Sequence, residues 1–139
     1  MSSIQPFHLA IPVSNLEESR VFYRELLGCT EGRSSDQWVD FNFFGHQLVI
    51  HAKEILTHDE ANNPVDGHDV PIPHFGVVLD MEGFWKLSER VKDSVTFIIE
   101  PYIRFEGQTG EQATMFFKDP AGNALEFKAF KNIDQLFIK

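Results

Sequence analysis

The sequence predicts an α+β fold in which two β-α-β-β-β modules form a cupped, mixed β-sheet with helices on its outer face. Three observations favour this class. An alternating apolar strand followed by a capped amphipathic helix occurs twice, and each helix is followed by further short strand-like runs. The two opening strands also carry histidines at matching positions, His8 and His74. Neither module could bury its own sheet face alone, so we assign a single domain to residues 1–139.

The first module is expected at about residues 5–52. Residues 7–13 alternate between apolar and other side chains, which predicts a strand that places His8 and Ala10 away from its apolar face. Ser14 and the glutamate three residues later form a capping-box pattern, so a helix is expected to begin there and to end at the glycine of LLG. Two further strands are expected on either side of a glycine turn, at residues 37–44 and 46–52.

The second module repeats this pattern at about residues 71–131. Before it, residues 53–70 are polar and acidic without a sustained period, which is typical of a linker or a surface loop. Residues 72–80 predict the opening strand, with His74 away from its apolar face, and Asp80 is expected to cap the second helix. The remaining strands are expected at residues 95–99, 102–105, 113–118 and 123–130.

The composition is that of a soluble globular domain and excludes several classes of protein. The 139 residues are 42% hydrophobic and 24% charged, and the excess of acidic residues gives a net charge of −9. Because no basic cluster interrupts this charge, nucleic acid and anionic membranes are poor candidates as partners. With a single cysteine, Cys29, no apolar run of membrane-spanning length and no secretion signal at its start, the chain is expected to be cytoplasmic.

Three side chains are candidates for a metal site, because each is expected on the side of a strand that the apolar face leaves free. His8 and His74 occupy equivalent places in the two modules, and a paired or closed sheet would bring them together. Glu126 is expected to point the same way from the last strand, where a buried carboxylate is costly unless it is paired or bound to a metal. Structural histidines and, for Glu126, an ion pair with Lys128 or a position on a solvated edge strand remain the alternatives. His51 lies at the end of the corresponding strand of the first module. It is either a further metal ligand, a side chain that supports a ligand, or an exposed histidine.

Three stretches of the sequence point to a known family. They are PFHLAIPVSNLEESRVFYRELLG, IPHFGVVL and FFKDPAGNALEFK, and together they span the chain from Pro6 to about Phe130. They resemble the vicinal oxygen chelate superfamily, which includes glyoxalase I, extradiol dioxygenases, fosfomycin-resistance transferases and bleomycin-binding proteins. Two longer stretches are most similar to a group of small predicted extradiol-type dioxygenases: EGRSSDQWVDFNFFGHQLVIH and RFEGQTGEQATMFFKDPAGNALEFK.

The resemblance implies a divalent metal ion held by His8, His74 and Glu126, with Fe(II) favoured and Zn, Ni or Mn also compatible. Glyoxalase I-like members carry a fourth ligand, usually Glu, at a place that His51 holds here. Two histidines and one carboxylate leave three positions of an octahedral ion open, which is the arrangement of non-haem Fe(II) oxygenases. If His51 also binds, two positions remain, and this suits Lewis-acid chemistry.

Three functions follow from these alternatives. The first is an extradiol-type dioxygenase, an oxidoreductase whose small substrate is chelated through two adjacent oxygens. The second is a glyoxalase I-like lyase or isomerase, and the occupancy of His51 separates these two. The third is a metal-free small-molecule-binding protein that resembles the bleomycin resistance proteins, which lack the ligand set that this sequence keeps.

The candidates on the substrate side centre on a glycine-interrupted loop, RFEGQTGEQ. This loop either closes over the mouth of the cup, where Arg104 would neutralise an anionic substrate beside Gln108 and Glu111, or is a solvated connection. Tyr102 and Lys128 are candidate donors near the metal. We expect the histidines of the turns and the linker to be solvated, namely His46, His58 and His68. The cysteine after the first helix, Cys29, is expected to be unreactive.

A homodimer is expected. Fourteen phenylalanines are difficult to bury in one small monomer, and the resembled family is commonly dimeric with sites at or near the subunit interface. At about 3.3 Å per extended residue, the linker of residues 53–70 is long enough to pair two modules of one chain or modules of two different chains. Both arrangements remain open.

Overall fold

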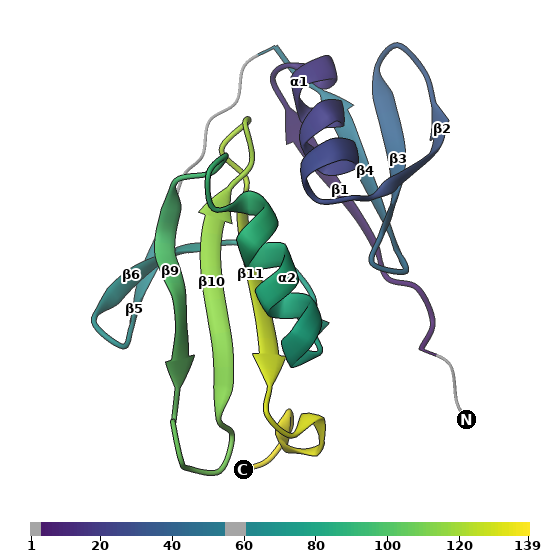
Figure 1. Ribbon diagram of the computed structural model, residues 1–139. Helices are drawn as coiled ribbons and strands as arrows, with labels where there is room; N and C mark the ends of the chain where they lie inside the picture. The colour runs from purple at the N-terminus through teal and green to yellow at the C-terminus, as the bar shows by residue number, and fades with distance from the viewer. Residues whose placement is uncertain (1–3, 55–60) are drawn as a thin grey trace. The chain divides into compact units, whose positions relative to one another are not determined.

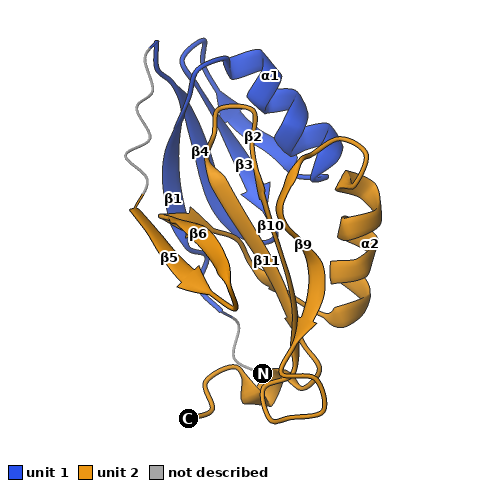
Figure 2. Cartoon of the chain, turned by 90° about the vertical axis from the view of Figure 1, so that its left-hand side faces the viewer, with its two compact units in different colours: residues 1–58 blue, residues 59–139 orange. Residues whose placement is uncertain are grey.

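The computed structural model describes residues 4–54 and 61–139 and divides the chain into two compact units (Figures 1 and 2). Unit 1 comprises residues 1–58 and unit 2 comprises residues 59–139, so the boundary falls within the expected linker. The expectations for residues 55–60, including a solvated His58, lie outside the described residues. Each unit combines helical segments with a mixed parallel and antiparallel sheet, which confirms the α+β class.

Unit 1 is a four-stranded sheet with one helical segment. The strand order is β1-β4-β3-β2, with β1 parallel to β4 and the other neighbours antiparallel. Helix α1 continues directly into a π-helical turn, η1, and Tyr23 of that turn packs against Phe41 and Phe43 of β3. The elements are β1 (His8–Val13), α1 (Leu16–Val21), η1 (Phe22–Leu26), β2 (Thr30–Ser34), β3 (Trp38–Phe43) and β4 (His46–Ala52).

The helical segment of unit 1 begins one residue later than the capping pattern suggests. Asn15, rather than Ser14, is the N-cap, because its backbone is extended and its side-chain oxygen accepts a hydrogen bond from the Glu18 amide at 2.9 Å. The segment ends before Gly28, whose φ of +75° is a conformation that favours glycine. Phe7, expected in the first strand, is exposed and precedes β1. Strand β2 is not indicated by alternation in the sequence, because the residues of β2 are polar and mostly exposed.

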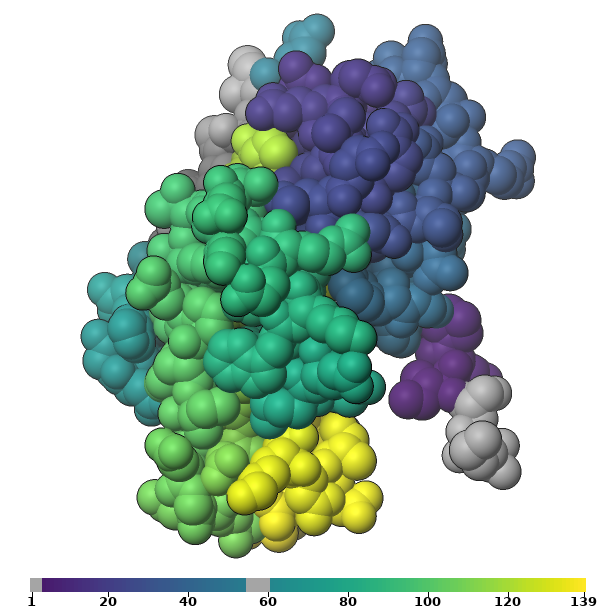
Figure 3. Space-filling model, in the orientation of Figure 1, coloured from purple at the N-terminus to yellow at the C-terminus, as the bar shows by residue number. Residues whose placement is uncertain are grey.

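Unit 2 has a helix on one face of its sheet and a β-hairpin on the other (Figures 1 and 2). The sheet follows the path β7-β11-β10-β9, and the short β8 also pairs with β11. The outer surface of helix α2 faces the viewer in Figure 3. The elements are β5 (Ala61–Val65), β6 (His68–Ile72), β7 (His74–Phe75), β8 (Val78–Leu79), α2 (Met81–Val91), β9 (Phe97–Arg104), β10 (Gln112–Lys118), β11 (Ala124–Phe130) and the 3-10 turn η2 (Ile133–Gln135).

Helix α2 is capped and packed as the sequence predicts. Asp80 is the N-cap, and its Oδ1 accepts a hydrogen bond from the Gly83 amide at 2.6 Å. The helix packs against β10 and β11, and the apolar residues buried on these elements include Phe84, Leu87, Val91, Met115, Phe117, Leu125, Phe127 and Ala129. No helix within residues 4–54 and 61–139 is long and apolar enough to cross a membrane.

Two predicted strand boundaries in unit 2 are wrong. The single strand expected at residues 72–80 is divided into β7 and β8 at Gly76, where a Cβ atom would lie 1.6 Å from the carbonyl oxygen of Glu126. Only a glycine allows the backbone to approach β11 so closely. The two strands expected at residues 95–99 and 102–105 form one strand, β9, whose pairing with β10 contains register shifts.

The expected linker contains regular structure instead of a simple loop. Strands β5 and β6 form a hairpin, and the two residues between them, Asp66 and Gly67, have φ values of +49° and +81°. These positive values are typical of the type I′ turn that an Asp-Gly pair favours. Val70 of β6 is buried against Ile99 and Phe116 of the sheet. The hairpin therefore packs on the face of the unit 2 sheet opposite α2.

Candidate functional site

Glu126 lies on the sheet face of unit 2 that looks away from helix α2. Along β11, Leu125 and Phe127 are fully buried toward the helix, so Glu126 between them points to the opposite face, as the alternation predicts. Only 11% of its side chain is exposed. A carboxylate this well buried needs partners, since desolvation of a charge is otherwise costly.

One carboxylate oxygen of Glu126 faces His74. The distance from His74 Nε2 to Glu126 Oε1 is 3.2 Å, and the other ring nitrogen, Nδ1, lies 2.7 Å from the carbonyl oxygen of Pro71. Because a carbonyl only accepts hydrogen bonds, Nδ1 carries a proton, so a neutral ring would present the lone pair of Nε2 toward the carboxylate. The ring of Phe116 meets the His74 ring edge-on at 4.8 Å and limits its rotation.

The second carboxylate oxygen of Glu126 has its own donors. Thr114 Oγ1 donates a hydrogen bond to Oε2 at 2.6 Å, and Lys128 Nζ lies 3.8 Å from the same oxygen. The ion pair with Lys128 that was the alternative explanation for Glu126 is thus present, but it is the longest of the three contacts. Thr114 and Lys128 hold Oε2 and leave Oε1 directed at His74, so the pair presents two electron-donating atoms to one point.

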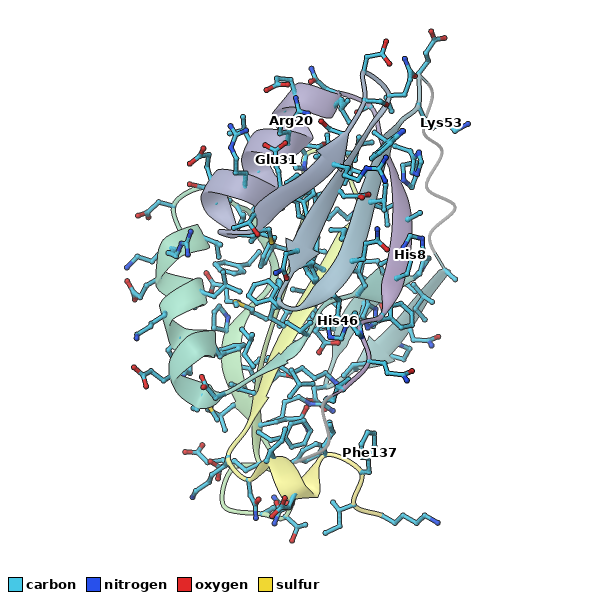
Figure 4. All side chains as sticks on the ribbon, turned by 90° about the vertical axis from the view of Figure 1, so that its right-hand side faces the viewer. His8, Arg20, Glu31, His46, Lys53 and Phe137 are labelled. Atoms are coloured by element: carbon cyan, nitrogen blue, oxygen red, sulfur yellow. The ribbon has the colours of Figure 1, made fainter. Side chains whose placement is uncertain are left out.

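His8 in unit 1 has a similar arrangement of partners. It lies exposed on β1 (Figure 4), and its Nδ1 is 2.9 Å from Oε1 of Gln47, the residue opposite it in the parallel pairing of β1 with β4. The Gln47 amide nitrogen donates to Asp40 at 3.4 Å, which supports this orientation of the amide. His8 therefore also directs Nδ1 at a carbonyl oxygen and keeps Nε2 available. Histidines that bind metals through Nε2 are commonly held in this way.

His51 lies four residues farther along β4 than Gln47. It is exposed, and it faces Pro12 on β1 and Trp38 on β3. Four residues of strand correspond to about 13 Å, so the side chain next to His8 in this sheet is Gln47 rather than His51. A metal-binding role for His51 stays a prediction. Sequence reasoning missed Gln47 because it depends on the register between strands that are distant in the chain.

The pair formed by His74 and Glu126 suits a divalent cation, since an imidazole nitrogen and a carboxylate oxygen are ligands for Fe, Zn, Ni and Mn. Within residues 4–54 and 61–139, however, no group of three or more His, Cys, Asp or Glu side chains is placed to hold one ion. His8 belongs to the other unit, so the three-residue ligand set stays a prediction.

A second polar cluster lies at the end of β9, where Tyr102 and Arg104 contact the hairpin. The Tyr102 hydroxyl donates a hydrogen bond to Asp66 Oδ2 at 2.7 Å. Arg104 donates from Nε to the same oxygen at 2.5 Å and from Nη2 to Oδ1 at 3.3 Å. Arg104, the expected partner of an anionic substrate, is therefore paired with a carboxylate of its own chain. Sequence reasoning missed Asp66, although the Asp-Gly pair is a known hairpin signal.

These contacts change the acid–base properties of the cluster. The Arg104 guanidinium and then the Tyr102 hydroxyl, through their hydrogen bonds, lower the pKa of Asp66 below its ordinary value. Burial and the hydrogen bond to Asp66 raise the pKa of Tyr102 to about 12. At neutral pH the cluster thus consists of a carboxylate, a guanidinium and a neutral phenol.

The other candidates have structural partners. Glu111 Oε1 accepts a hydrogen bond from the Gly107 amide at 2.7 Å and so closes the turn after β9, in which Gln108 also lies. His46 Nδ1 accepts from the Phe7 amide at 2.8 Å. The ring of His68 lies 6.0 Å from that of Tyr102, and Cys29 is buried.

Comparison with known proteins places these features in a family. The family model described as "Glyoxalase/Bleomycin resistance protein/Dioxygenase superfamily" matches residues 5–127. The chain is 29% identical over 119 residues to glutathione transferase FosA of Serratia marcescens, covering 86% of this chain and 76% of that protein. Among solved structures it is similar to a glyoxalase/bleomycin resistance protein/dioxygenase from Alicyclobacillus acidocaldarius, with 32% identity, 96% of each chain covered and a TM-score of 0.78.

A third similarity concerns the fold alone. Lactoylglutathione lyase from Agrobacterium tumefaciens is 20% identical, with 100% of this chain and 98% of that chain covered and a TM-score of 0.65. Because the family model spans most of the chain, from the strand with His8 to the strand with Glu126, the resemblance to the superfamily is confirmed, whereas the similarity to the extradiol-type group stays a prediction. The chain belongs to the glyoxalase/bleomycin resistance protein/dioxygenase superfamily, the vicinal oxygen chelate superfamily.

Proposed function

We propose that this protein is a metal-dependent enzyme that acts on a small substrate bound to the ion through two adjacent oxygens, with extradiol-type dioxygenase chemistry as the leading reaction. The observation that carries the proposal is the pair of His74 Nε2 and Glu126 Oε1 at 3.2 Å. In the neutral ring both atoms are acceptors, and a shared divalent cation would satisfy them together.

The proposed ligands are His8, His74 and Glu126. Both histidines direct Nδ1 at a carbonyl oxygen, which leaves Nε2 as the metal-binding nitrogen in each ring. Two neutral imidazoles and one carboxylate form the donor set of non-haem Fe(II) oxygenases, so Fe(II) is favoured over Zn, Ni or Mn. A divalent ion held there would supply Lewis-acid activation of the chelated substrate and, as Fe(II), redox chemistry with dioxygen.

The chain's own residues orient the carboxylate and the substrate. Thr114 holds Oε2 of Glu126 by a hydrogen bond, so that Oε1 remains available as a ligand. The ammonium group of Lys128, one third exposed, lies on the same face and is available to donate a hydrogen bond to a substrate oxygen. Lys128 is therefore the substrate-side donor in this proposal.

The surroundings of His8 favour oxidative cleavage over isomerisation. An enzyme of the four-ligand type needs an additional strong donor beside the first histidine, whereas the residue opposite His8 is Gln47, a neutral amide whose oxygen is already in contact with the ring. His51 lies about 13 Å along the strand from that position. This arrangement supports three protein ligands, which is the number that leaves room for a chelating substrate and dioxygen.

A Lewis-acid reaction is the second candidate. The 29% identity to glutathione transferase FosA over most of the chain favours an addition of a thiol to an activated substrate, and the similarity in fold to a lactoylglutathione lyase is compatible with isomerase or lyase chemistry. A metal-free binding protein, the third alternative, would leave the His74 and Glu126 acceptors facing each other without a cation unless the histidine were protonated.

The two reactions are separated by assay of the full-length protein loaded with Fe(II) under anaerobic conditions. Catechols are supplied with dioxygen in one assay, and methylglyoxal with thiols in another. Consumption of dioxygen with formation of ring-opened products supports the dioxygenase. Turnover only in the thiol assay would replace the first reaction with the second.

A further inference from the structure

We propose that Tyr102 and Arg104 form a subsite for a carboxylate group of a small molecule, and that Asp66 fills this subsite with its own carboxylate when no ligand is bound. The inference rests on the proposed function and adds that the substrate carries a negatively charged carboxylate. It also means that a side chain of the protein itself competes with the substrate for this subsite. It rests on the geometry of three side chains within unit 2.

The donors are arranged to hold one planar carboxylate. Arg104 donates from two different nitrogens to the two oxygens of Asp66, at 2.5 and 3.3 Å, and Tyr102 donates a third hydrogen bond at 2.7 Å. Two parallel hydrogen bonds from a guanidinium fork are the geometry by which arginine recognises carboxylates specifically. The guanidinium also lies 4.8 Å from the ring centre of Phe105, which restricts its position.

The donors and the acceptor differ in how firmly they are held. Tyr102 and Arg104 stand on β9 of the main sheet, and only 17% of the Arg104 side chain is exposed. Asp66 occupies a two-residue turn at the tip of a hairpin, and 39% of its side chain is exposed. The hairpin contacts the sheet through the apolar packing of Val65 and Val70 and through the ring of His68 near that of Tyr102, and its tip does so through the hydrogen bonds of Asp66. An incoming carboxylate can therefore replace Asp66 when the tip moves, without unfolding of the sheet.

The subsite lies next to the proposed metal ligands. Tyr102 pairs with Thr114 on β10, and Thr114 pairs with Lys128 on β11 and donates to Glu126. Neighbouring strands are about 4.8 Å apart, so β9 and β11 are separated by roughly 10 Å, the length of a small organic molecule. A ligand with a carboxylate at one end could bind Arg104 while its other end reaches the face that carries Glu126.

Competition by Asp66 has a measurable consequence. If Asp66 fills the subsite about nine-tenths of the time, the apparent affinity for an external carboxylate is reduced about tenfold. Replacement of Asp66 by Asn removes the competing charge, and Asn is tolerated at the positive φ of this turn, so the fold is retained. A purely structural role for the cluster predicts the opposite, namely a loosened hairpin and no ligand.

The test is an NMR titration of the full-length, nitrogen-15-labelled protein, read at the backbone amides of β9 in every variant and also at the Arg104 Nε–Hε resonance where Arg104 is present. Sodium benzoate is the probe, and neutral benzamide of the same shape is its control. We expect saturable shifts with benzoate alone, with about tenfold tighter binding in Asp66→Asn, and loss of binding in Arg104→Gln. Asp69→Asn, which removes the same charge from β6 of the same hairpin, should bind as the unsubstituted protein does.

Three results would overturn the proposal: no saturable shift in Asp66→Asn, equal shifts with benzamide, or benzoate binding that survives in Arg104→Gln. The experiment needs neither metal nor turnover. A failed anion subsite is therefore distinguishable from a failed metal centre, which is tested by metal content.

Discussion

His74 Nε2 and Glu126 Oε1 lie 3.2 Å apart, and each residue is fixed from its other side, His74 by the carbonyl of Pro71 and Glu126 by the hydroxyl of Thr114. The two proposed ligand atoms are thereby oriented before any ion binds. Because the side chains are already ordered, metal binding would lose less conformational entropy. Hydrogen bonds that support ligands in this way also tune metal affinity.

Replacement of His74 by Ala should remove most of the bound divalent metal while the protein stays folded, because in the proposed site the side chain is a ligand and it is not part of the apolar core. Metal per chain is measured by elemental analysis after dialysis, and circular dichroism checks the fold. His68→Ala, a histidine substitution on the neighbouring hairpin, is the matched control and should retain the metal. Full retention in His74→Ala would refute the proposed ligand set.

Thr114→Val should weaken metal binding without abolishing it. Valine keeps the shape of the buried side chain but removes the hydroxyl that holds Glu126 Oε2, and loss of such a supporting hydrogen bond costs about 10- to 100-fold in metal affinity. The affinity is measured by competition with a chromophoric chelator. Thr114→Ser restores the donor and should restore binding, whereas equal affinities in all three proteins would show that the hydrogen bond has no role in the site.

The Tyr102 phenol should titrate well above ordinary tyrosines. Burial and the hydrogen bond to Asp66 raise its pKa to about 12, compared with about 10 in the unfolded chain. Because the folded pKa is the higher one, its contribution to stability is present below about pH 10 and is lost as the pH rises toward about 12.

This titration is measured by the ultraviolet absorbance of tyrosinate, with Tyr102→Phe identifying the signal. Asp66→Asn should lower the pKa of Tyr102, since it removes the negative charge but not the burial. A Tyr102 signal that titrates near pH 10 in the unsubstituted protein would contradict the contact between Tyr102 and Asp66.

Gly76→Ala should destabilise unit 2 by about 3 kcal/mol, since the new Cβ would meet the backbone carbonyl of Glu126, which cannot move aside without breaking β11. Urea-induced unfolding measures the change. Gly32→Ala is the control, because its Cβ would make only an ordinary contact at 3.4 Å with Asp40, and its effect should stay within about 0.5 kcal/mol. Equal effects of the two substitutions would mean that β7 and β8 do not approach β11 in this way.

The parts of the site that the sequence predicts are those that depend on short-range patterns within one strand or helix. Alternation along β11 is enough to place Glu126 opposite Leu125 and Phe127, and the cap at Asp80 is read from a short motif. Gln47 could not be found in this way, because its position beside His8 depends on the register of two strands that are 39 residues apart. Register of this kind is set by packing and is not visible in either strand alone.

The hairpin that carries Asp66 was missed for a different reason. Its strands are mostly exposed, and the two buried residues of β6, Val70 and Pro71, are adjacent, so the strands lack the alternation that marks a half-buried strand. The Asp-Gly pair at its turn is the only local signal, and its significance depends on strands that the pattern does not show.

The last prediction concerns assembly. If the modules pair between two chains of a homodimer, each metal site takes His8 from one chain and His74 from the other, so neither His8→Ala nor His74→Ala alone has an intact site. A mixed dimer of the two variants would then combine both substitutions in one site and leave the other site complete. With random exchange of chains, the mixture should regain about one quarter of the sites of the unsubstituted protein, measured as bound metal per chain. Pairing within one chain predicts no recovery on mixing, and a monomer by sedimentation at micromolar concentration would exclude the exchanged dimer altogether.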